Sequence, residues 1–489
     1  MQQPARTASV HRPLLIVIGA ILVCYVLATL AGWTTPAAPG AAHAEHAPQM
    51  SRVAHFWAVI PFTLLLGAIA VLPLVEHSAH WWEHNLHKFY VAFTLALITL
   101  MYVAMLHPEG SLGRALETLE HAIIKDYIPF ITLLFCLYTI SGGIRLTGDL
   151  PAHSLTNAAF ITGGGLLASF VGTTGAAMLL IRPLLETNAE RKHVAHTVVF
   201  FIFVVCNCGG LLLPLGDPPL FLGYLNGVDF LWTFSLWRSW LFVNGALVVL
   251  YLLLDHFYYR RRETKSDMVR DETTVRPLTV SGLWPNALLL VGIIISVALL
   301  DPSKPFLGTS WYPWIYLREM VQLVLVALSL GLGPQSVRDD NNFDYLAIVE
   351  VAALFIGIFI AMQPALEILN ARGGSLGIDT PMKFFWASGI LSSVLDNAPT
   401  YLVFFKTAQT LPAGDANLVA GVAEPLLRGI SLGSVLMGAM TYIGNGPNFM
   451  VKTIAENSGV RMPSFFGYVV YSVAFLLPIL AVNVWLFLR

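Results

Sequence analysis

The chain has 489 residues, of which 56% are hydrophobic and only 11% are charged, and its formal net charge is -2. A soluble protein could not cover that much apolar surface, whereas repeated apolar runs of about 20 residues fit a lipid bilayer. The balanced charge offers no basic stripe for nucleic acid, so we expect an all-α polytopic membrane protein whose surroundings are the lipid bilayer.

The first apolar segment, 14–31, follows Arg6 and Arg12 and precedes a stretch rich in Ala and Pro at 32–49. A basic head before an apolar run is typical of a signal peptide, but this run is long and the nearest small-residue triplet is distant. We therefore expect residues 1–53 to form a retained helix and an external loop, with a signal peptide as the alternative.

Further apolar segments raise the expected number of membrane-spanning helices to about 11, each close to the length that crosses a bilayer. The expected spans are 14–31, 54–75, 89–106, 127–144, 196–222, 237–256, 286–300, 314–333, 346–369, 429–454 and 465–487. They are grouped into scaffold helices at 54–126, a first repeat at 127–256, a linker with scaffold helices at 257–345, and a second repeat at 346–489.

Two more apolar stretches, 160–184 and 384–407, carry turn residues at their centres, and Asp396 in the second lies 224 residues after Gly172 in the first. Each arm is about 10 residues long, which is too short to cross a hydrocarbon core about 30 Å thick. A segment can turn back inside a membrane only where protein or water surrounds its broken backbone. We therefore predict two re-entrant hairpins.

Two of the expected spans, 196–222 and 429–454, contain Gly and Pro that a continuous helix would not tolerate. Gly216-Asp-Pro-Pro219 interrupts the first, and Gly444-Asn-Gly-Pro-Asn448 interrupts the second 228 residues later. Proline removes an amide donor and does not fit inside a continuous helix, so both spans should be discontinuous. Paired interruptions at matching places in two halves indicate the binding site of a secondary transporter.

The orientation follows from the basic residues, which are concentrated in the loop 258–276. If this loop is cytoplasmic, the N-terminus is also inside and the stretch 31–51, which has no Lys or Arg, is outside. Counting spans from there gives the two halves opposite orientations. We therefore predict inverted-topology repeats.

Carboxyl, amide and hydroxyl groups at these interruptions are the candidate ligands of an ion. A carboxylate inside a bilayer is costly, so a proton and a cation become competing ways to neutralise it. Neutral side-chain oxygens are suitable additional ligands for a hard cation such as Na⁺. The alternative is that Asp217 caps a half-helix and Asp396 caps the second arm of its hairpin. The candidate residues are Asp396, Asn397, Asp217, Thr173, Thr174, Asn445 and Asn448.

Other chemistry finds little support in the sequence. Four histidines at 77, 80, 84 and 87 could share a helix face and serve as a metal site or pH sensor, although an interfacial helix explains them as well. The Cys spacing predicts neither a disulfide nor a transition-metal site. Because no phosphate-binding loop or nucleophile elbow occurs, we expect neither an enzyme nor a cofactor.

From residue 54 to its end the chain resembles the NhaD-type sodium/proton antiporters, which belong to a superfamily with arsenite permeases, P-protein transporters and dicarboxylate/sodium symporters. The resemblance implies export of Na⁺ or Li⁺ against H⁺ across a bacterial inner membrane, by a homodimer with an elevator-type mechanism. The most specific segments are Trp82-Glu-His-Asn85, Ser141-Gly-Gly-Ile-Arg145, Gly172-Thr-Thr-Gly175, Gly216-Asp-Pro-Pro219, Leu395-Asp-Asn-Ala-Pro399 and Gly444-Asn-Gly-Pro-Asn448.

The leading hypothesis is a Na⁺(Li⁺)/H⁺ antiporter with Asp396 as the main shared site and Asp217 in support. A second is a Na⁺- or H⁺-coupled anion transporter for organic acids, arsenite or sulfate, with Arg145 or the half-helix N-termini as the anion contact. Dicarboxylate relatives carry Ser-Asn-Thr at both hairpin tips, whereas this chain has Gly172-Thr-Thr and Asp396-Asn-Ala, and this departure argues against citrate or succinate as the substrate. A third is a membrane subunit or sensor whose broken helices are structural.

Overall fold

The computed structural model describes residues 6–36, 53–261, 275–412, 414 and 416–489. The described residues are mostly helical, so the expected helical class is confirmed. Most of the expected N-terminal external loop and of the basic loop at 258–276 lies outside the described residues. The chain divides into unit 1, which comprises residues 1–55, 88–145 and 280–360, and unit 2, which comprises residues 56–87, 146–279 and 361–489.

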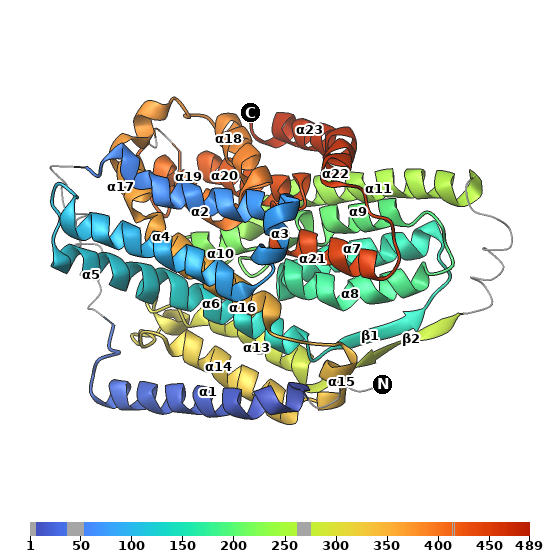
Figure 1. Ribbon diagram of the computed structural model, residues 1–489, viewed down its shortest axis with the longest axis horizontal. Coiled ribbons are helices and arrows are strands. Elements are labelled where there is room, and N and C mark those ends of the chain that lie inside the picture. Colours follow the sequence, from blue (N-terminus) through green and yellow to red (C-terminus); the bar gives the residue numbers. More distant parts are fainter. Residues whose placement is uncertain (1–5, 37–52, 262–274, 413, 415) are drawn as a thin grey trace. The chain divides into compact units, whose positions relative to one another are not determined.

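Unit 1 is built from long apolar helices (Figure 1). Its elements are α1 (Arg6–Leu30), most of α4 (Asn85–Met105), α5 (Leu112–Glu120), η3 (His121–Tyr127), α6 (Ile128–Ser141), α13 (Leu283–Leu299), η6 (Phe306–Gly308), α14 (Leu317–Leu332), α15 (Gln335–Asp340) and most of α16 (Leu346–Ala361).

An aromatic cluster forms part of the core of unit 1. Phe130 of α6 stacks on Phe355 of α16 at 4.8 Å between ring centroids and meets Phe359 edge-on at 5.5 Å. A Cβ atom added at Gly357 would lie 2.7 Å from Cβ of Ala92, so α16 and α4 approach closely only because position 357 is Gly. The helices of unit 1 therefore pack through complementary large and small residues.

Unit 2 contains the two predicted hairpins and the two predicted broken helices. Its first elements are η1 (Phe56–Val59), α2 (Ile60–Val71), η2 (Leu72–Leu74), α3 (Glu76–Trp82), α7 (Ser154–Val171), α8 (Thr173–Thr187), α9 (Ala195–Val204), η4 (Cys208–Leu211), α10 (Pro218–Leu225), η5 (Trp232–Leu236) and α11 (Trp237–Arg261). The later elements are α17 (Gln363–Arg372), η7 (Gly373–Leu376), α18 (Pro381–Val394), α19 (Asn397–Gln409), α20 (Glu424–Leu436), η8 (Met437–Met440), α21 (Gly446–Asn457), α22 (Phe465–Tyr471), η9 (Ser472–Leu476) and α23 (Leu477–Phe487).

Two short pairs of strands accompany the helices. The sequence did not predict these strands. β1 (Arg145–Asp149) pairs with β2 (Arg276–Ser281), and β3 (Leu418–Val419) pairs antiparallel with β4 (Val422–Ala423). Each pair is small and neither forms a closed sheet.

By length and composition, six described helices could cross a membrane, or seven if α16 and the segment from Gln363 to Leu376 count as one span. This agrees with a multi-pass membrane protein but is fewer than the roughly 11 spans predicted. The difference has a structural cause, because several predicted spans contain only shorter helices, such as Phe56–Val71, Ala195–Leu211 and Leu283–Leu299.

Both predicted hairpins correspond to pairs of helices joined by a short turn. In the first, α7 and α8 lie side by side (Figure 1), and the chain reverses at Gly172, whose φ of 82° favours Gly. Its arms have 18 and 15 residues, longer than the arms of about 10 that the sequence indicated. In the second, α18 and α19 have 14 and 13 residues. Re-entry into a membrane remains a prediction for both.

Candidate ion-binding site

The two broken helices of unit 2 share one backbone geometry. Asp217 precedes α10 with φ -145° and ψ 140°, and Asn445 precedes α21 with φ -153° and ψ 140°. Each follows a tight glycine-lined turn: a Cβ at Gly216 would overlap the carbonyl oxygen of Gly210, and a Cβ at Gly444 would lie 2.6 Å from that of Gly438. The two halves therefore make the same break, with an acid in one and an amide in the other.

The tip of the first hairpin is bound to the first break. The backbone N–H of Thr173 donates to the carbonyl of Gly216 at 2.9 Å, immediately before Asp217. The Thr173 side chain also lies against Gly210, where an added Cβ would be 2.8 Å from its methyl group. Backbone contact thus fixes the hairpin tip beside the acid.

The Asp217 carboxylate is the centre of the cluster, with only 1% of the residue exposed. Its Oδ2 accepts from Asn397 Nδ2 at 2.8 Å, and its Oδ1 accepts from Asn445 Nδ2 at 3.0 Å and from Thr173 Oγ1 at 3.3 Å. All three of these contacting side chains are neutral. Hydrogen bonds stabilise a buried carboxylate but do not cancel its charge, so a proton or a bound cation is needed.

A chain of amides joins the two breaks. Asn207 Nδ2 donates to Asn448 Oδ1 at 2.8 Å, while Asn207 Oδ1 accepts from Asn445 Nδ2 at 3.3 Å. Asn448 Nδ2 in turn donates to the carbonyls of Gly438 and Thr441 at 2.9 and 3.0 Å. Asn207 was missed in the sequence, although one Asn inside the apolar run just before a Gly pair is a usable signal.

The remaining predicted residues take different positions. Asp396 is half-buried, its side chain caps α19 by accepting from the N–H of Ala398 at 3.1 Å, and it lies within electrostatic range of Asp217. Asp217 makes no such cap bond, so the capping alternative applies to Asp396 and not to Asp217. Thr174 is half-buried and is not among the residues that contact Asp217. Asn397 Oδ1 is buried and has no hydrogen-bond partner among the described residues.

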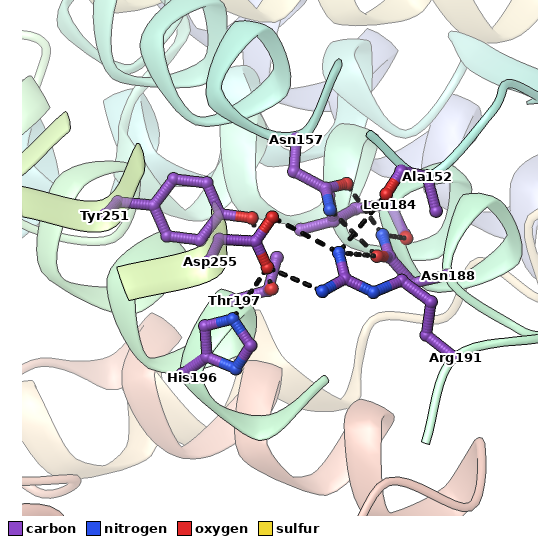
Figure 2. Close-up of polar contacts among 9 residues, drawn as sticks. All are labelled: Ala152, Asn157, Leu184, Asn188, Arg191, His196, Thr197, Tyr251 and Asp255. Carbon is purple, nitrogen blue, oxygen red and sulfur yellow. Dashed lines mark hydrogen bonds and ion pairs between the residues drawn. The ribbon is translucent and has the colours of Figure 1, made fainter. Parts of the chain in front are cut away.

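A second buried polar cluster in unit 2 contains its own counter-charge (Figure 2). Arg191 contacts the two carboxylate oxygens of Asp255 at 2.7 and 3.3 Å, and His196 Nε2 contacts the same group at 2.7 Å. Asn157 and Asn188 exchange amide hydrogen bonds at 2.8 and 2.7 Å, and Figure 2 shows Asn188 facing the same guanidinium. Since the positive and negative groups are paired, the cluster connects α7, α8, α9 and α11 without needing an ion.

Two other predicted features have partners of their own. Arg145, the proposed anion contact, pairs with Asp340 at 2.8 Å. In the histidine segment, His87 stacks on Trp81 at 4.6 Å and His80 Nδ1 lies 3.2 Å from Glu83. Within the described parts of the chain, no group of three or more His, Cys, Asp or Glu residues is arranged to hold a metal.

Several apolar helices, together with a buried carboxylate between two broken helices, define a membrane transport protein as the class. The family comparison is more specific: residues 51–488 match the family described as "Putative citrate transport", so the chain belongs to that family. This agrees with the broader resemblance to the ion transporter superfamily, while NhaD-type membership remains a prediction. The chain is also 22% identical over 388 residues to an uncharacterized transporter of Schizosaccharomyces pombe, covering 67% of this chain but only 44% of that relative.

Proposed function

We propose that the protein is a secondary active transporter that exchanges Na⁺ or Li⁺ for H⁺, with Asp217 as the shared coupling site. The observation that carries the proposal is a carboxylate that is 1% exposed and contacted only by the neutral side chains of Thr173, Asn397 and Asn445. The sequence favoured Asp396 as the main site, but Asp396 is half-buried and caps a helix, so we assign the larger role to Asp217.

Competition at one carboxylate supplies the coupling. A proton neutralises Asp217 directly, whereas Na⁺ does so as a counter-ion that also needs several oxygen ligands. Asn397 Oδ1 is buried beside the carboxylate without a hydrogen-bond partner in the described part of the chain, so it can serve as one of them. H⁺ and Na⁺ therefore exclude each other, because each neutralises the same negative charge on Asp217.

The test uses everted membrane vesicles with an imposed ΔpH and a fluorescent pH probe. Adding Na⁺ or Li⁺ should collapse the gradient for the unchanged protein, and Asp217→Asn should abolish the response. Asp379→Asn is the matched control, because Asp379 is an exposed residue paired with Lys383 at 2.7 Å. Exchange that persists in Asp217→Asn at normal expression would contradict the proposal.

A second variant separates the two candidate carboxylates. Asp396→Asn should leave the α19 cap intact because Asn caps a helix as well as Asp, so the variant changes only charge. We expect exchange to persist with weaker Na⁺ affinity. Complete loss here, with exchange retained in Asp217→Asn, would return the main role to Asp396.

The family match favours a second candidate, coupled transport of a carboxylate of the citrate class. The N-termini of α10 and α21 carry partial positive charge that suits an anion, although Asp217 stands at the start of α10. Uptake of labelled citrate into proteoliposomes, driven by a Na⁺ or H⁺ gradient, tests this candidate. Citrate flux without Na⁺-dependent proton movement would replace the exchange proposal.

The cellular setting is also part of the proposal. We place the protein in a bacterial inner membrane as a homodimer that works by an elevator-type movement, and the resemblance to NhaD-type antiporters supports this. Cross-linking of single-cysteine variants in native membranes tests the dimer, and a purely monomeric product would contradict it.

A further inference from the structure

Unit 1 contains a buried guanidinium that contacts no carboxylate among the described residues. Arg338, on the short helix α15 of unit 1, is 0% exposed. Its Nη2 donates to Ser329 Oγ at 2.6 Å and weakly to the carbonyl of Thr139 at 3.5 Å. Its Nε and Nη1 are buried without a hydrogen-bond partner among the described residues.

The contrast with unit 2 shows why this is unusual. Arg191 is also buried, but Asp255 neutralises it through two contacts (Figure 2). The acids nearest to Arg338 in sequence are engaged elsewhere: Asp340 pairs with Arg145 at 2.8 Å, and Asp339 accepts from Gln335 at 3.2 Å. A buried charge without a partner is strongly destabilising, so a bound anion is the expected source of the missing counter-charge.

Other hydrogen-bond donors without partners lie around the same guanidinium. The hydroxyls of Thr139 and Tyr345 and the Nε2 of His11 are all buried without a partner in the described residues. Tyr345 lies against Thr139 and within electrostatic range of Arg338, as does His11, and the His11 and Tyr345 rings meet edge-on at 6.3 Å. These four side chains, from α1, α6, α15 and the residue before α16, are therefore neighbours.

Each of these groups can donate to an anion. Burial raises the pKa of Tyr345 to about 12, so its hydroxyl keeps its proton and can donate. A guanidinium has five N–H donors and no acceptor. Gly333 borders Nη1: an added Cβ would lie 3.1 Å from that nitrogen and 2.5 Å from the Ser329 carbonyl oxygen, so the backbone approaches the guanidinium closely there. The walls are aromatic, since Phe343 and Phe135 both pack on Tyr345.

We infer that Arg338, Thr139, Tyr345 and His11 form a binding site for a small inorganic monoanion such as chloride within unit 1. The anion supplies the charge that Arg338 lacks and accepts hydrogen bonds from the guanidinium and from both hydroxyls. The site holds α1, α6 and α15 together, so the bound anion stabilises this unit. All of these residues belong to unit 1, and the inference does not depend on the exchange chemistry proposed at Asp217.

The test measures thermal unfolding of the purified full chain in detergent, at constant Na⁺ and ionic strength, in chloride, bromide or gluconate. Chloride and bromide should raise the unfolding midpoint saturably by a few degrees over gluconate. Tyr345→Phe removes one donor to the anion and should raise the half-saturating chloride concentration by about 10-fold. Thr139→Val should act in the same direction.

Tyr442→Phe is the matched control, because its hydroxyl donates to Pro463 at 3.1 Å within unit 2. It should leave the chloride dependence unchanged. Equal midpoints in all three salts, or the same chloride response in Tyr345→Phe as in the unchanged protein, would overturn the site. An experimental structure in bromide should show the ion beside Arg338, and a water molecule there instead would also overturn it.

Discussion

Removing Asn207 tests whether the amide network positions the candidate site. Asn207 does not contact Asp217, but it donates to Ile202 and Asn448 at 2.9 and 2.8 Å and accepts from Asn445 at 3.3 Å. In Asn207→Ala the side-chain oxygen Oδ1 of Asn448 loses the amide that donates to it. We expect the free energy of unfolding to fall by about 2–4 kcal/mol. Asn445 keeps its bond to Asp217 but loses one of its acceptors, so the apparent Na⁺ affinity should weaken by about 3- to 10-fold.

The matched control for this prediction is Asn244→Ala. Asn244 is also a buried Asn, and its amide donates to the carbonyls of Cys208 and Trp240 at 3.2 and 2.8 Å, outside the cluster. Both variants should lower the thermal unfolding midpoint, but only Asn207→Ala should shift the Na⁺ concentration that half-collapses ΔpH. The positioning role would be refuted if both variants lose stability and keep the unchanged protein's Na⁺ dependence.

Two further variants test the backbone of the breaks and the buried ion pair. Gly216→Ala should prevent normal folding, because its Cβ would overlap the Gly210 carbonyl. Gly446→Ala has nothing within 4 Å of its Cβ and should fold. Equal yields of folded protein from the two variants would contradict the close approach at Gly216. Asp255→Asn leaves Arg191 without its counter-charge and should cost about 3–5 kcal/mol of unfolding free energy. A thermal shift no larger than that of the exposed Asp379→Asn control would show that this pair contributes little.

Much of the architecture could be predicted from the sequence because Gly and Pro in apolar runs have few structural meanings. The chain breaks at Gly172 and before α10 and α21, as the motifs indicated. The lengths of the helices were harder to predict, because apolar composition continues through the ends of helices. That is why the predicted span 54–75 extends beyond both ends of the shorter helix Phe56–Val71, and why the arms of the first hairpin are longer than expected.

Choosing among the candidate ligands required contacts that the sequence does not contain. Thr173 and Thr174 are equivalent in composition, yet only Thr173 bonds to Asp217 because the hairpin tip is fixed by its backbone N–H. Asp396 has the same chemistry as Asp217, yet it caps a helix while Asp217 does not. Arg338 belongs to no motif, and Asn207 carries only the signal of one Asn before a Gly pair, because the importance of both residues arises from neighbours far away in the sequence.

Under the proposed exchange function, the unequal chemistry of the two equivalent breaks explains how a repeated backbone could provide a single coupling site. Asp217 and Asn445 occupy matching positions before matching helices, and Asn445 donates to Asp217 at 3.0 Å. Two acids at this separation would repel each other, and two amides would leave no charge for a cation or proton to neutralise. One acid paired with one amide leaves a single buried negative charge. The proton or cation that neutralises this charge determines the net charge of the whole cluster. An ion-exchange site needs that property, and the repeat alone does not provide it.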